Sequence, residues 1–194
     1  MDHVEEVRAV IGPPSGPGVP AESWRGLESD LGVELPGDFK ELAGQYAPIQ
    51  IGRSIWLMGP ATVAHDLGDY MRETVVAYEA CEFSEENFPG FPEPLGFGAP
   101  DGLIPIMPTA HGESVFLARS DSAYGWCIVV YVGDDDEFYR YDLTFTEWFC
   151  RYLRGEDMTG PNSGQDFSNP IALRDYHVPP GEKSVERFGP VRAS

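Results

Sequence analysis

Cysteine is scarce in this chain, and its distribution excludes the structures that cysteine usually builds. The three cysteines stand at positions 81, 127 and 150, an odd number with wide spacing and no Cys-x-x-Cys pair. Neither a disulfide framework nor a cysteine-based zinc module is indicated, and we expect no metal. Scattered, unpaired thiols are typical of a reducing compartment.

Basic residues are also few. Thirteen Lys and Arg against 32 Asp and Glu give a formal net charge of −19. Cations that neutralise phosphates dominate the binding of nucleic acids, so we expect no nucleic-acid partner. An anionic membrane surface is disfavoured for the same reason. The acidity is compatible with a basic protein partner, and equally with solubility alone.

Long hydrophobic runs and targeting signals are missing as well. The longest strongly apolar run, Trp126 to Val132, is far shorter than a segment that crosses a bilayer. The N-terminus, Met1 to Glu6, has neither a basic n-region nor an apolar h-region. We therefore expect no membrane association and a cytoplasmic protein.

The composition that remains is that of an ordinary globular domain. The 194 residues are 42% hydrophobic and 23% charged, which lies outside the disordered and fibrous classes. At this length folding buries roughly 70% of the surface of the unfolded chain, so no disulfide or metal is needed to hold the core. We expect an N-terminal helix and Pro/Gly linker over 1–20, an α+β domain over 21–155, and a polar, irregular extension over 156–194.

The first half of the domain has helical periodicity. Trp24, Leu27 and Leu31 share one helical face, and Gly32 ends that segment. Two further helices are predicted at Gly37 to Ala47 and Pro60 to about Ala80, with two short strands between them inside Ile49 to Met58.

The second half has strand patterns followed by one helix. A proline-interrupted connection, Cys81 to Pro100, is too irregular for regular structure, and we expect it on the surface. Thr144 and Glu147 form a capping box before a stripe of large apolar residues, which predicts a helix that lies on a sheet. Four strands of an antiparallel meander precede it: Leu103 to Met107, Ser114 to Ala118, Trp126 to Val132 and Phe138 to Asp142. The predicted fold class is α+β, a twisted, largely antiparallel sheet flanked by helices.

No motif of an enzyme active site stands in the chain. The glycines of 96–102 predict a turn and not a phosphate-binding loop, because a proline and an acid stand where a helix would have to begin. His65 and His111 have carboxylate neighbours, but too few ligands for zinc, so we expect His65 on the surface of an acidic helix and His111 in a turn. Cys127 lies in the most apolar strand, where burial raises the pKa of a thiol. We expect no catalytic residue and no cofactor.

The acidic residues are concentrated in one part of the chain. Between Asp66 and Glu137 fifteen acids stand against Arg72 and Arg119, which accounts for −13 of the total charge. The run Asp134, Asp135, Asp136 and Glu137 falls in a tight turn, where like charges repel and add nothing to stability. This run is either a solvated turn or a surface that presents a negative field, and the sequence leaves both interpretations open.

A series of ordered segments runs from about Ser23 to Gly155. They read Trp24-x-x-Leu27-Glu28-x-x-Leu31-Gly32-x-x-Leu35-Pro36-x-Asp38-Phe39-Lys40-x-Leu42, Trp56-Leu57-x-x-Pro60, Gly96-Phe97-Gly98 with Asp101-Gly102, Trp126-Cys127-Ile128-Val129-Val130, and Tyr141-Asp142-x-Thr144-Phe145-Thr146-Glu147-Trp148-Phe149. This order resembles the SUKH superfamily, which joins bacterial toxin-immunity proteins to the Smi/Knr-type cell-wall regulators of yeast. The chain departs from the family pattern at Ala47-Pro48, where members often carry Asn-Gly or Tyr-Gly, and again after Glu156.

The resemblance implies an α+β binding protein without a catalytic centre or cofactor. Many bacterial members are immunity proteins that occupy a toxin, often a nuclease. We therefore expect a basic protein partner whose nucleic-acid-binding or active-site surface is covered by Asp134, Asp135, Asp136, Glu137, Glu85 and Glu86. Tyr124 is a candidate aromatic anchor for the partner, whereas Trp126 is expected to be buried in its strand. The alternative is an intracellular scaffold or regulator of the Smi/Knr type, acting through Cys81 to Pro100 and the polar tail. The sequence does not indicate an oligomeric state.

Overall fold

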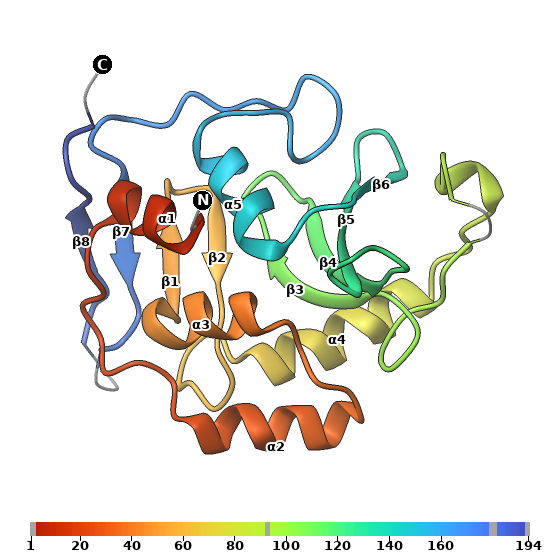
Figure 1. Ribbon diagram of the computed structural model, residues 1–194, viewed down its shortest axis with the longest axis horizontal. Coiled ribbons are helices and arrows are strands. Elements are labelled where there is room, and N and C mark those ends of the chain that lie inside the picture. The colour runs from red at the N-terminus through yellow and green to blue at the C-terminus, as the bar shows by residue number, and fades with distance from the viewer. Residues whose placement is uncertain (1–2, 92–93, 179–181, 193–194) are drawn as a thin grey trace.

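The computed structural model describes residues 3–91, 94–178 and 182–192, and shows helices packed around two antiparallel sheets (Figure 1). The helices are α1 (His3–Ile11), α2 (Ala21–Leu31), α3 (Gly37–Tyr46), α4 (Leu67–Glu79), the short 3₁₀ helix η1 (Glu85–Asn87) and α5 (Phe145–Leu153). The strands are β1 (Ile49–Ile51), β2 (Ile55–Leu57), β3 (Ile104–Pro108), β4 (Ser114–Arg119), β5 (Trp126–Val132), β6 (Glu137–Tyr141), β7 (Ala172–Asp175) and β8 (Val185–Phe188). The predicted α+β class is confirmed.

The eight strands form two sheets that lie side by side (Figure 1). One sheet has the order β3-β4-β5-β6 and is the predicted meander, because each strand pairs with the next in sequence. The other has the order β2-β1-β7-β8. An isolated bridge between Ile55 and Thr109 connects the two sheets.

The C-terminal segment differs from the irregular extension that the sequence predicts. It supplies β7 and β8, and β7 pairs with β1 so that Leu173 lies opposite Ile51. Leu173 is only 1% exposed, so this segment contributes to the core. Each of the two strands is four residues long and carries charged residues, so strand propensity alone gives a weak signal and pairing with a distant strand decides the structure.

The first helix is also part of the core. Val4, Val7 and Ile11 of α1 are buried, and the helix packs against α5. Just after α1, the carbonyl of Gly12 accepts a 2.7 Å hydrogen bond from the buried hydroxyl of Tyr46 at the end of α3. The start of the Pro/Gly segment is thereby fixed to the domain.

Helix α5 follows the sequence prediction closely. The hydroxyl of Thr144 accepts a hydrogen bond from the backbone N–H of Glu147 at 3.2 Å, which caps the first turn. The predicted apolar stripe is buried, with Trp148 and Phe149 at 0% exposure. The indole N–H of Trp148 donates to the carbonyl of Met158, so its one polar atom is satisfied.

Helix α4 starts later than the sequence predicts. It begins at Leu67 rather than Pro60, because the side chain of Asp66 accepts the N–H of Asp69 at 2.9 Å and caps the helix there. Ala61 and His65 both have a positive φ, which breaks the helical path before this cap. His65 therefore lies in the loop ahead of α4 and not on the helix, where the sequence predicts it.

None of the helices among the described residues is long and apolar enough to span a membrane.

The sheet β3-β4-β5-β6 is covered on both faces. Ile128 and Val130 of β5 point into the main core, while Cys127 and Val129 belong to a second, largely aromatic cluster. The connection 81–100 packs onto that second cluster through Phe88, which is 3% exposed. The described part of the connection is largely exposed, as the sequence predicts. It is not wholly irregular, however, because it contains the 3₁₀ helix η1 and the buried anchor Phe88.

Candidate functional site

The predicted acidic turn joins β5 to β6. Asp134, Asp135 and Asp136 are exposed, and Glu137 is half-buried where β6 begins. Asp136 has a φ of 55°, a left-handed conformation that aspartate adopts more readily than most residues. The turn thus projects a run of carboxylates from the end of a rigid hairpin.

Two tyrosines hold these carboxylates in place. The hydroxyl of Tyr131 donates to Asp136 Oδ1 at 2.8 Å, and the hydroxyl of Tyr139 donates to Glu137 Oε2 at 2.7 Å and Asp135 Oδ2 at 3.1 Å. Burial and the Asp136 carboxylate raise the pKa of Tyr131 to about 12. The hydrogen bond to Glu137 raises the pKa of Tyr139 above its usual range. Both hydroxyls therefore remain protonated donors at neutral pH.

The helix η1 lies beside this turn, although it is almost fifty residues away in the chain. The side-chain amide of Asn87 donates to the backbone carbonyl of Asp136 at 2.6 Å. Ser84 and Asn87 form a capping box around η1, which orders the residues between them. Glu85 and Glu86, both exposed, are thereby placed next to the acidic turn.

A cluster of aromatic side chains anchors η1 to β6. Phe88, the residue after η1, lies parallel to Phe138 of β6 with ring centroids 4.4 Å apart and an interplanar angle of 2°. Phe83 contacts the ring of Phe138 at 5.1 Å, and Phe91 contacts Phe88 at 5.6 Å. Phe138 is 0% exposed, so the two acidic segments are tied to the same buried ring.

We call the six residues on these two segments the acidic face. They are Glu85, Glu86, Asp134, Asp135, Asp136 and Glu137. Within residues 3–91, 94–178 and 182–192, no Lys or Arg forms an ion pair with any of them, whereas nine of the basic residues pair with carboxylates elsewhere. The protein's own cations leave this face unneutralised.

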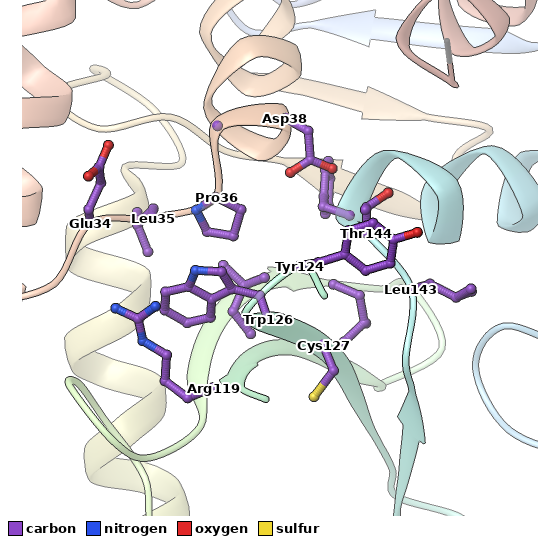
Figure 2. A pocket seen from close by; sticks show the side chains of 14 residues that line it. Glu34, Leu35, Pro36, Asp38, Arg119, Tyr124, Trp126, Cys127, Leu143 and Thr144 are labelled. Carbon is purple, nitrogen blue, oxygen red and sulfur yellow. The ribbon is translucent and has the colours of Figure 1, made fainter. Parts of the chain in front are cut away.

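Tyr124 lies away from the acidic face, because it precedes β5 whereas the acidic turn follows that strand. The hairpin between β4 and β5 carries it to the rim of a pocket of about 430 Å³ (Figure 2). The tyrosine is 57% exposed. The structure therefore brings six of the seven predicted partner-binding residues together and places the seventh at a separate site.

The pocket at Tyr124 is lined by the segment that leads into α3, by the β4–β5 hairpin and by the segment that leads into α5 (Figure 2). The guanidinium of Arg119 lies 4.1 Å from the ring centre of Trp126, its cross-strand neighbour. Asp38 is occupied structurally, since its Oδ2 accepts the N–H and the hydroxyl of Thr146 at 2.9 and 3.0 Å. Trp126 is buried, as the sequence predicts.

The other residues that the sequence analysis considered have structural roles. Cys127 is 2% exposed, and burial raises the pKa of its thiol, as predicted. His65 packs edge-on against Tyr176, with ring centroids 4.3 Å apart. A Cβ at Gly102 would lie 2.6 Å from the carbonyl oxygen of Gly98, so the glycines of 96–102 make a tight turn.

Sequence reasoning missed the residues that assemble the acidic face. Asn87, Phe88, Tyr131 and Tyr139 carry no motif, and an asparagine or tyrosine near acids is common. The alternation of β5 and β6 could have placed Tyr131 and Tyr139 near the turn. The contact between Asn87 and Asp136 could be found only in the tertiary structure, because the two residues are 49 positions apart in the chain.

A comparison with protein families gives one match. The family model described as "SMI1-KNR4 cell-wall", of the SUKH group, matches residues 21–149. This range begins at α2, ends within α5 and includes the whole acidic face. No curated protein and no solved structure matches the chain significantly.

Proposed function

Since the chain belongs to the SMI1-KNR4 family of the SUKH superfamily, we propose that it is a non-catalytic immunity protein that neutralises a basic, nuclease-type toxin. The acidic face covers the surface with which the toxin grips nucleic acid or carries out its chemistry. Such a surface has to be cationic to hold phosphates. A face of six carboxylates that form no ion pair with any described Lys or Arg is complementary to it.

The observation that carries the proposal is the preorganisation of the acidic face. Like charges brought together in a turn repel and cost stability, and Tyr131, Tyr139 and Asn87 hold them together despite this cost. A solvated turn needs no such scaffold. Complementary charges raise the rate of encounter and reject wrong partners more than they raise affinity, and a specific interface of this class buries roughly 1,600 Å² in total.

The alternative, an intracellular scaffold of the Smi/Knr type, has less support. It assigns partner binding to the connection 81–100 and to the polar tail. The described parts of both segments are anchored, through the buried side chains of Phe88 and Leu173. The alternative therefore depends on the residues of these segments that remain exposed.

The test measures binding to the purified toxin candidate encoded next to this protein's gene. The quadruple variant Asp134→Asn, Asp135→Asn, Asp136→Asn, Glu137→Gln removes four charges while keeping side-chain size, and asparagine tolerates the positive φ at position 136. A matched control removes four exposed, unpaired acids elsewhere: Glu22→Gln, Asp30→Asn, Glu156→Gln and Asp166→Asn. Both variants have the same net charge.

We expect the acidic-face variant to lose at least about tenfold in association rate at low salt, and the control to lose much less. Wild-type binding should weaken steeply from about 50 to 500 mM salt, because screening shortens the range of charge interactions. Stoichiometric wild-type protein should also block the toxin's nuclease activity. Equal losses in the two variants, or binding that ignores salt, would exclude the acidic face as the interface.

A further inference from the structure

A cluster of metal-ligand side chains lies where α1 packs against α5, on elements other than those that carry the acidic face. A ring nitrogen of His3, a carboxylate oxygen of Glu6 and Sγ of Cys150 all lie within 4.8 Å of one another. His3 and Glu6 are three residues apart, so they share one face of α1. Cys150 comes from α5, and therefore the cluster bridges the two helices.

Two atoms of the cluster are buried without a hydrogen-bond partner among the described residues. These are His3 Nδ1 and Glu6 Oε1. They lie 3.9 Å apart, beyond hydrogen-bond distance. Buried polar atoms are nearly always paired, and one established reason for an exception is an ion that completes the site. The two unpartnered atoms are lone-pair donors of the kind that bind a metal.

The other polar groups around Glu6 leave this position open. Its second oxygen, Oε2, accepts the Cys150 thiol at 3.2 Å and forms an ion pair with Arg154. Oε1 is therefore the free coordinating oxygen, and Arg154 can stay on Oε2 as an outer partner that orients the carboxylate. The side chains of His3 and Glu6 are 30% and 17% exposed, while the two unpartnered atoms themselves are turned away from solvent.

We propose that His3, Glu6 and Cys150 bind a zinc ion that clamps α1 onto α5. Imidazole nitrogen, thiolate sulfur and carboxylate oxygen are the three ligand types of protein zinc sites, and three protein ligands leave a fourth position for water. Zinc–ligand bonds of about 2.0–2.3 Å imply ligand atoms roughly 3.5 Å apart. The 4.8 Å cluster therefore closes by about 1 Å through rotation of the part-buried His3 and Glu6 side chains.

Binding must release a proton at neutral pH. The Cys150 thiol donates a hydrogen bond to Glu6 Oε2, so the metal-free thiol carries its hydrogen. When the Zn–S bond forms, this proton passes to solvent, and the ion's two positive charges are balanced by the thiolate and the carboxylate. One proton leaves for each ion bound.

The test titrates the full chain, without a polyhistidine tag, with Zn²⁺ and with Co²⁺ as a spectroscopic probe. We expect one ion per chain, a sulfur-to-cobalt charge-transfer absorption, and release of one proton when calorimetry is compared between two buffers. Zinc should also raise the thermal unfolding midpoint. Cys150→Ser should abolish the charge-transfer absorption and weaken binding at least tenfold, whereas Cys81→Ser, which removes an exposed thiol, should change neither.

His3→Gln provides a second variant in case Cys150→Ser fails to fold, since His3 is part-exposed near the N-terminus. It should fold like the wild type and lose at least tenfold in zinc affinity together with the thermal shift. Absence of binding at about 100 μM zinc would overturn the proposal and leave an ordinary His3–Glu6 ion pair. Binding that persists in His3→Gln, or that depends on Cys81, would overturn it as well.

Discussion

Replacing Phe88 by alanine tests whether the aromatic stack builds the acidic face. Phe88 is 3% exposed and stacks on Phe138, which is 0% exposed, at 4.4 Å. Removal of a buried phenylalanine costs about 3–5 kcal/mol through lost transfer free energy and the cavity left behind. The Phe88–Phe138 stack adds about 0.5–1.5 kcal/mol to the burial of area.

The polar contacts that remain are too weak to hold η1 without this ring. The Asn87 hydrogen bond to Asp136 and the Ser84 capping box are exposed, and each is worth about 0.5–1.5 kcal/mol. The loss of Phe88 exceeds these contributions. We therefore expect residues 84–91 to open locally while the hairpin of β5 and β6 stays folded.

Amide hydrogen exchange measures this opening directly. The amides of Asn87, Phe88 and Phe91 donate to carbonyls within the same segment at 3.1 Å, so they report on its local structure. A loss of about 3 kcal/mol in the free energy of local opening makes the exchange of these amides more than about 100-fold faster. The free energy of unfolding in urea should also fall, by at most about 5 kcal/mol. Association with the basic partner should slow, because Glu85 and Glu86 are no longer held beside the acidic turn.

Phe188→Ala is the matched control, because Phe188 of β8 is 58% exposed. Its removal should change stability by no more than about 0.5 kcal/mol. If Phe88→Ala behaved like Phe188→Ala in both urea unfolding and exchange, the connection 81–100 would not be anchored by the stack. The account of the acidic face as a preorganised surface would then be wrong.

Two further predictions concern the C-terminal strands and the acidic turn. Leu173→Ala should lower the free energy of unfolding by about 2–5 kcal/mol in a denaturant titration, because Leu173 is 1% exposed. A change under about 0.5 kcal/mol would contradict its place in the core. The folded-state pKa of Tyr131, about 12, lies above its ordinary value of 10, so the stabilising contribution of its protonated form is present below pH 10 and lost as the pH rises through 12. Asp136→Asn should lower this pKa, measured as tyrosinate absorbance relative to Tyr131→Phe; an unchanged titration would argue against the hydrogen bond.

Local patterns were sufficient for most of the secondary structure. The apolar spacing of α2, α3 and α5 and the cap at Thr144 act within one or two helical turns, so they can be read without knowing the fold. The meander of β3 to β6 follows from strand patterns separated by short turns. The start of α4 was predicted too early, since the helical pattern continued upstream of the Asp66 cap.

The long-range contacts could not be derived in the same way. The four-residue segment β7 becomes a strand by pairing with β1, more than a hundred residues away, and β8 becomes one by pairing with β7. The acidic face needs Asn87 against Asp136, and the zinc cluster needs α1 against α5. Each of these features depends on which elements pack together.

The amino-acid order alone therefore established the fold class and the acidic turn. The packing of the chain decided that Glu85 and Glu86 join that turn, that Tyr124 lies apart, and that the tail completes a sheet. The physical reason is the range of the interactions. Periodicity and capping act between neighbours in sequence, whereas side chains distant in sequence meet only when burial of the apolar core brings their elements together.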